Sequence, residues 1–165
     1  VLRLRPPSVP LVDEFLRTKG ADADKAALLA HLSGGRPGYA LRLLEDDSSL
    51  EFRTEKLNEF RELLSAARVA RFAYAEALAK DKDAFRATLL LWLSLWRDVM
   101  LQTAGETDAI TNIDVRELIE TLASKLDLSA AKEQLVSAEN AIGQLQRNVN
   151  ARLLAENILL DFPKR

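Results

Sequence analysis

Apolar residues recur every third or fourth position along most of this chain, and this spacing restricts the fold more than any other feature. Spacings of three and four place side chains on one face of a helix. Leucine and alanine are abundant, whereas valine, isoleucine and aromatic residues are sparse, which favours helices over strands. We therefore expect an all-α fold. The clearest stripe consists of Leu57, Phe60, Leu64, Ala67, Arg71, Tyr74 and Leu78.

Turn and capping residues divide this pattern into a short first part and a longer second part. After an extended segment at 1–7, three short helices are expected, from Ser8 to Gly20, from Asp22 or Asp24 to Ser33, and from Pro37 onward. The polar run 46–49 then indicates a domain boundary. We expect a small three-helix domain at 1–46 and a larger domain at 47–165.

The second part is expected to form a bundle of roughly five helices. Residues 50–80 are interpreted as one long helix or a broken pair, and the last helix ends near Pro163. Residues that accept hydrogen bonds from free backbone N–H groups mark the other helix starts. These expected caps are Asp83, Asp114, Ser129 and Asn150.

The composition argues against several classes of function. There is no cysteine, which excludes disulfides, thiolate metal sites and cysteine nucleophiles. A formal net charge of −2 argues against a dedicated nucleic-acid binder. The longest apolar run, 87–96, is too short to cross a bilayer, so we expect no membrane contact and a cytoplasmic protein. The first residue is Val1 rather than methionine, which indicates a piece of a longer protein.

The sequence contains no recognisable catalytic constellation. His31 is the only histidine, and no serine, cysteine or second metal ligand accompanies it in a known spacing. Acidic residues alternate with basic ones, which is typical of solvated helix faces. We expect a chain that is itself non-catalytic, with no cofactor and no metal.

The glycine-rich stretch 34–38 has two interpretations. It lacks the spacing of a phosphate-binding loop, and a tight turn between helices explains its glycines and its proline. A helix N-terminus nevertheless favours an anion, to which Arg36 would add charge. The turn is the favoured interpretation, and Arg36 remains a weak candidate for contact with a nucleotide.

Two further features could be core or subunit interface. The apolar helix around Trp92, Leu95 and Trp96 is expected to be buried on more than one side, by its own chain or by another subunit. Asn150 is explained as an N-cap, whereas Asn148 is free to contact a neighbouring helix. For the helix that carries Trp92 and Trp96, burial by its own chain and burial by another subunit both remain open.

The order of these features resembles the delta-prime clamp-loader subunits of bacterial DNA polymerase III, a branch of the AAA+ family. Essentially the whole chain takes part in the resemblance, and its closing stretch is the most specific. The stretches that carry it are LRLRPPS (2–8), LLAHLSGGRPGYALRLLE (28–45), WRDVM (96–100), TNID (111–114) and NVNARLLAENILLDFP (148–163).

The resemblance implies an AAA+ lid at 1–46 and a helical collar domain at 47–165. In this family the collars of five subunits associate, and the assembly uses ATP to load a sliding clamp on primed DNA within the polymerase III holoenzyme. The implied partners are gamma/tau-type and delta-type subunits, with the clamp and the primer-template reached indirectly. The implied interface residues are Trp92, Leu95, Trp96, Asn148, Asn150 and Arg152.

Tyr39 occupies the position where relatives carry a nucleotide-sensing arginine. A phenol cannot supply the charged, forked donor that a γ-phosphate needs. Either Arg36 takes over this role or the subunit does not sense nucleotide. The second interpretation is favoured because the resemblance implies a delta-prime subunit, which acts as the stator of the assembly. The alternatives are a regulatory domain that senses ATP through Arg36 and, ranked last, a helix-turn-helix DNA binder built on the first three helices.

Overall fold

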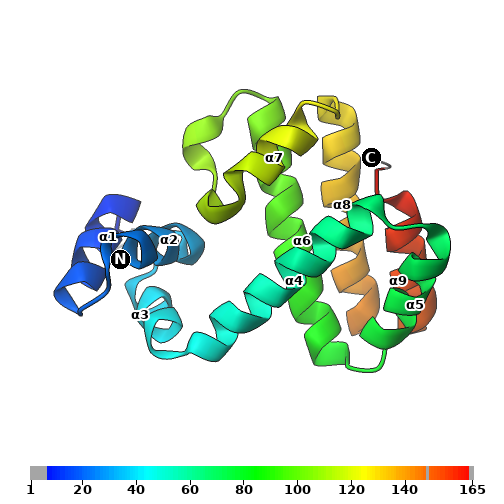
Figure 1. The fold of residues 1–165 in the computed structure, drawn as a ribbon, viewed down its shortest axis with the longest axis horizontal. Coiled ribbons are helices and arrows are strands. Elements are labelled where there is room, and N and C mark those ends of the chain that lie inside the picture. The colour runs from blue at the N-terminus through cyan, green and yellow to red at the C-terminus, as the bar shows by residue number, and fades with distance from the viewer. Residues whose placement is uncertain (1–6, 148, 164–165) are drawn as a thin grey trace, which may run out of the picture.

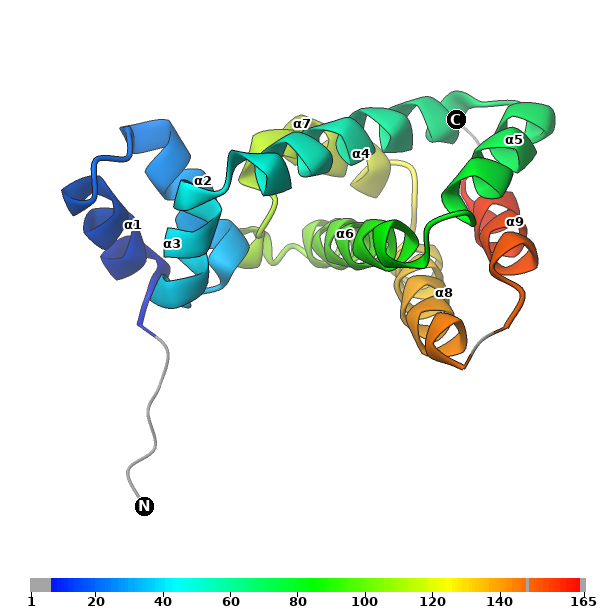
Figure 2. The ribbon, with the colours of Figure 1, turned by 90° about the horizontal axis from the view of Figure 1, so that it is seen from below.

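The computed structural model describes residues 7–147 and 149–163, which form helices and no strand, so the expected all-α fold is confirmed. Two short 3₁₀ segments, η1 (Thr107–Ala109) and η2 (Ile113–Val115), lie in the loop after the longest helix. Figures 1 and 2 show the arrangement. The α-helices are α1 (Val9–Thr18), α2 (Ala23–Ser33), α3 (Pro37–Glu45), α4 (Asp47–Ser65), α5 (Arg68–Leu78), α6 (Lys82–Thr103), α7 (Arg116–Ala123), α8 (Leu128–Gln146) and α9 (Ala151–Asp161).

Two separate hydrophobic cores hold these helices together. The smaller core lies among α1–α3, which we call the three-helix unit, and the larger core lies among α4–α9. Helix α4 joins the two, because Leu50 packs against the smaller core and Leu57 is buried in the larger one. Asp46 links α3 to α4, and its carboxylate accepts a hydrogen bond from the Ser48 backbone N–H at 3.1 Å. A single residue therefore separates the last helix of the unit from the helix that enters the bundle.

Helix α6 is the centre of the larger bundle and packs against α4, α5, α7 and α8, while α9 packs against α5 and α8. Phe60 and Phe162 meet the two tryptophans of α6 in an aromatic cluster, with ring centroids 5.0–6.2 Å apart. The bundle has six α-helices among the described residues rather than roughly five. The stripe at 50–80 breaks at Ala66 and Ala67, whose backbone is extended, so the broken pair is the correct alternative.

The structure confirms two of the expected caps and corrects three others. Asp22 accepts from the Lys25 N–H at 2.8 Å, and Asn150 accepts from the Leu153 N–H at 3.2 Å. Asp81 and Asp127, not Asp83 and Ser129, cap α6 and α8. Each of these caps lies two residues earlier than expected. Only a side chain in extended backbone just before the first turn reaches the free N–H groups.

The third correction concerns Asp114, which was expected to cap the helix after the 104–113 loop. It lies within η2, and α7 has no side-chain cap. Its carboxylate forms an ion pair with Arg53 of α4 instead. The Asp114 carboxylate, which the local sequence pattern predicts to be a cap, therefore pairs with Arg53, a residue distant in sequence.

Candidate subunit interface

Trp92, Leu95 and Trp96 lie in the larger core, with 0%, 1% and 1% of their surface exposed. In this conformation they present no surface to a partner, and they hold α6 against the aromatic cluster. Leu90, on another side of α6, is 42% exposed. The two tryptophans of this helix are therefore core residues in this structure rather than surface that another subunit could cover. The apolar surface that remains open is on the side of Leu90.

The remaining expected interface residues lie around the start of α9. Asn148 lies outside the described residues. Asn150 caps α9, as expected from the sequence. Arg152 is half exposed and forms ion pairs with Glu76 of α5, at 3.3 Å, and with Glu156 one turn along α9, at 2.9 Å. Arg152 therefore links α9 to α5 at the surface, where such pairs contribute little to stability.

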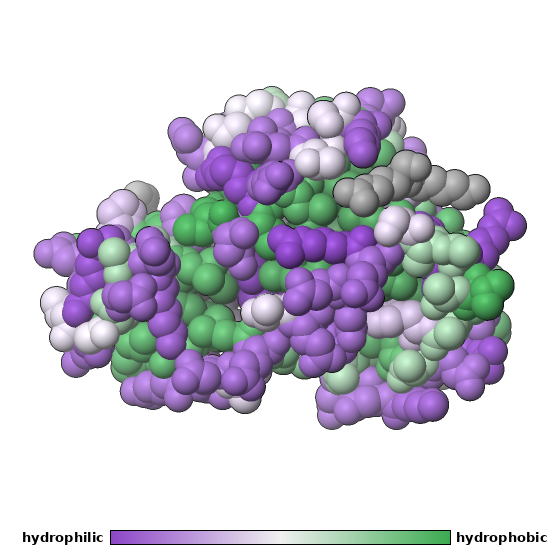
Figure 3. All heavy atoms as spheres, viewed as in Figure 1, coloured by the Kyte–Doolittle hydropathy of each residue, from purple (hydrophilic) through white to green (hydrophobic). Residues whose placement is uncertain are grey.

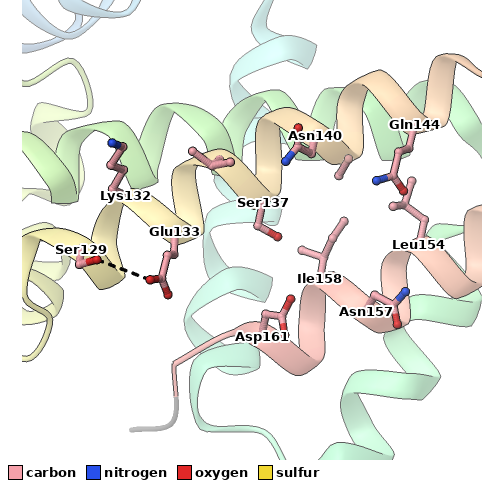
Figure 4. A pocket seen from close by; sticks show the side chains of 12 residues that line it. Ser129, Lys132, Glu133, Ser137, Asn140, Gln144, Leu154, Asn157, Ile158 and Asp161 are labelled. Carbon is pink, nitrogen blue, oxygen red and sulfur yellow. Dashed lines mark hydrogen bonds between the residues drawn. The ribbon is translucent and has the colours of Figure 1, made fainter.

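A groove of about 610 Å³ runs between α8 and α9, and we call it the α8–α9 groove. Figure 4 shows the side chains that line it, with Ser137 of α8 and Ile158 of α9 facing each other. At one end, the Gln134 side chain of α8 donates to the Asp161 carbonyl of α9 at 2.8 Å. This bond joins α8 to the last residue of α9.

The α8–α9 groove is lined by both polar and apolar side chains. The amides of Asn140, Gln144 and Asn157 make no hydrogen bond to another residue in the described part of the chain. Val136 lies in the groove and Leu153 lies one turn before Asn157, and they are 40% and 56% exposed. These amides and exposed apolar side chains are therefore available for contact with a partner.

Sequence reasoning missed this groove because its residues lie on the polar side of α8. The apolar stripe of that helix, which includes Ala131, Ala138 and Leu145, faces the core. The opposite side of α8 has the composition of an ordinary solvent-exposed face. Periodicity alone therefore does not distinguish a binding groove there from a surface that only contacts water. Val136 was a local signal, because it is a large apolar residue that falls outside the stripe.

The glycine-rich stretch forms a tight turn between α2 and α3. Gly34 and Gly35 adopt positive φ angles of 57° and 76°, which other residues rarely adopt. Arg36 donates from Nε to the Ser33 carbonyl at 2.8 Å, and its guanidinium lies 5.5 Å from the centre of the Tyr39 ring. The turn explains the glycines, as favoured from the sequence, and one of the Arg36 donors is already used within it.

The described ranges 7–147 and 149–163 contain no group of three or more His, Cys, Asp or Glu side chains placed to hold a metal ion. None of their helices combines the length and the apolarity that crossing a membrane requires.

Comparison with known proteins gave one informative match. Residues 48–164 match the family model described as DNA polymerase III, delta subunit, C terminal. No curated protein and no solved structure matched the chain. The matched range begins within the first turn of α4 and includes the whole larger bundle with the α8–α9 groove. The chain therefore belongs to the family defined by the C-terminal domain of the DNA polymerase III delta subunit, and it is a clamp-loader component.

Proposed function

We propose that this chain is the lid and collar part of a delta-prime-type clamp-loader subunit. The observation that carries the clamp-loader role is the family match over α4–α9, whose model is that of a delta subunit. The finer delta-prime assignment rests on the sequence resemblance, above all on the closing stretch 148–163. Two further features support a division into a lid at 1–46 and a collar at 47–165. The two cores are separate, and the match begins at residue 48, where α4 leaves the three-helix unit.

In this proposal the collar joins the chain to the gamma/tau-type and delta-type subunits of the pentamer. The contact is made through the α8–α9 groove and the exposed side of α9. Trp92, Leu95 and Trp96 support this surface from the core, Asn150 holds the start of α9, and Arg152 lies at its edge. Fully buried side chains cannot supply binding energy directly, whereas exposed Val136 and Leu153 can.

The chain takes part in clamp loading by assembly rather than by chemistry. The sliding clamp and the primer-template are reached through the other subunits, and the complex acts in the cytoplasm. ATP is hydrolysed by neighbouring subunits.

The test is assembly with purified clamp-loader subunits. The double variant Val136→Asp/Leu153→Asp is expected to lower the affinity for gamma/tau-type and delta-type subunits about a hundredfold, because two exposed apolar contacts become charged. Loss of co-elution on size-exclusion chromatography would report this change. Leu11→Asp is the matched control, since Leu11 is 57% exposed on α1 and Leu153 is 56% exposed on α9. Circular dichroism checks that each variant is folded.

Two results would contradict the proposal at different levels. Assembly of the double variant with wild-type affinity would exclude the α8–α9 groove as the contact. Failure of the wild-type chain to bind any clamp-loader subunit would overturn the assembly function itself.

A further inference from the structure

A second groove, of about 870 Å³, lies between the three-helix unit and the larger bundle. Its walls come from α3, the first half of α4 and the first half of α6, together with Leu32 of α2 and with Thr111 and Asn112 of the loop after α6. In Figure 2 the three-helix unit and α6 lie on the same side of α4. The groove does not share any lining residue with the α8–α9 groove. We call it the arginine groove.

The charge of the arginine groove differs from that of the whole chain. Its lining includes Arg36, Arg42 and Arg53 but no aspartate or glutamate, although the chain carries 25 acidic and 23 basic residues. Arg53 is neutralised by its ion pair with Asp114 and also donates to Asn112 at 2.8 Å. The uncompensated positive charge therefore belongs to Arg36 and Arg42.

Arg36 and Arg42 lie on either side of Tyr39 along α3. Their guanidinium carbons are 5.5 and 5.7 Å from the centre of its ring, a cation–π geometry that orients the side chains. Neither arginine forms an ion pair with a carboxylate within the described part of the chain. Two oriented and unpaired guanidinium groups therefore line one wall of the groove.

The rest of the arginine groove is largely apolar. Leu90 of α6 is 42% exposed and Tyr39 is 39% exposed, while Leu50 and Phe52 of α4 are partly exposed. Figure 3 shows apolar atoms at the surface where the three-helix unit meets the larger bundle. A phosphate backbone would leave these side chains uncovered, whereas a peptide with apolar side chains would cover them.

We propose that the arginine groove binds an acidic peptide segment of a partner protein that carries aromatic or aliphatic side chains. The carboxylates pair with Arg36 and Arg42, and the apolar side chains pack against Leu90 and Phe52. Arginine favours such pairs because its planar fork matches a carboxylate with two hydrogen bonds. The proposal goes beyond collar assembly, because it places a second partner at the junction of the two cores.

The test uses fluorescence anisotropy with the full chain and defined probes. A library of peptides about twelve residues long, built from Asp, Glu, Leu, Phe and Ser, is screened, and the tightest peptide is labelled. Arg36→Glu/Arg42→Glu is expected to weaken its binding at least about tenfold, because attraction becomes repulsion. Leu90→Ala is expected to weaken it about threefold or more, since apolar contact is lost.

The control variant is Arg116→Glu/Arg147→Glu, which changes the net charge equally at two exposed arginines outside the groove. It is expected to bind the labelled peptide as the wild type does. The proposal is overturned if no acidic peptide binds, if a library with Lys in place of Asp and Glu binds equally well, or if the control weakens binding as much. A single-stranded oligonucleotide is tested as well. If it binds as tightly as the labelled peptide and needs the same two arginines, the groove is a phosphate site and the proposal is overturned.

Discussion

The guanidinium of Arg71 donates hydrogen bonds to four main-chain carbonyls in the larger core. Two belong to the end of α4, at Leu63 (3.1 Å) and Leu64 (3.4 Å), and two to the end of α9, at Leu159 (2.7 Å) and Phe162 (3.2 Å). Carbonyls at a helix C-terminus lack intrahelical partners and carry partial negative charge. Burial lowers the pKa of Arg71, but a guanidinium remains charged at neutral pH. One cation therefore satisfies two helix ends.

Replacement of Arg71 by methionine is expected to lower the free energy of unfolding by about 3 kcal/mol or more. The reason is that the variant leaves several buried carbonyls without a donor. Urea denaturation followed by circular dichroism measures the change. Arg147→Met, at an exposed arginine at the end of α8, is the control and should change the stability by no more than about 0.5 kcal/mol. An equal effect of the two variants would refute the structural role of Arg71.

At the scale of single helices, a side-chain cap marks the start of α2, α4, α6, α8 and α9. Helix α8 shows this most clearly, because both Asp127 and Ser129 have side chains suited to a cap. Asp127 has extended backbone (φ −76°, ψ 170°) and accepts from the Ala130 N–H at 2.8 Å. Ser129 is already inside the first turn, where its hydroxyl is not needed by the backbone.

Asp127→Ala is expected to lower the free energy of unfolding by about 1 kcal/mol, because it removes the acceptor for a free N–H group. Ser129→Ala should have an effect near zero, since alanine has the higher helix propensity at a helical position. Thermal and urea denaturation of the two variants provide the comparison. The reverse order of the two effects would place the cap at Ser129.

At the scale of the whole molecule, a buried polar network connects α4, α6 and the 104–115 loop. The amide of Asn112 donates to Asp98 at 2.8 Å and to Ser94 at 2.9 Å, and it accepts from Arg53 at 2.8 Å. Asp98 is fully buried and also accepts from two backbone N–H groups of the loop. The His31 Nδ1 of α2 lies 3.1 Å from the Ile110 carbonyl in the same loop. The loop therefore contacts both the three-helix unit and the bundle.

Asn112→Ala is expected to increase amide hydrogen exchange in the 104–115 loop and at the end of α2. The variant removes three hydrogen bonds of a buried side chain, a loss of about 2 kcal/mol in local stability. Exchange in α8 and α9 should not change, because no residue of these two helices belongs to the network. Asn58→Ala, at an exposed asparagine of α4, is the control. Faster exchange throughout the chain would show that the effect is global rather than local.

Local pattern predicted the helical class, most helix boundaries, the capping role of Asn150 and a helix start at Asp22 or Asp24. These features depend on residues a few positions apart, and a spacing of three or four identifies them. The same reasoning placed three caps wrongly. At α6 and α8 a neighbouring aspartate two residues earlier caps the helix, and Asp114 pairs with the distant Arg53 instead of capping α7. It left open whether the tryptophans of α6 are core or interface, since that helix is apolar on nearly every side.

The sequence by itself determined that this chain folds into helices and which side of most helices is apolar. Only the tertiary structure decided which apolar surfaces are covered and which polar groups meet. Arg71 and Leu159 are 88 positions apart, and Arg53 and Asp114 are 61 positions apart. The α8–α9 groove and the arginine groove likewise arise where separate helices meet. Periodicity describes one helix at a time, whereas burial and pairing depend on how all the helices pack together.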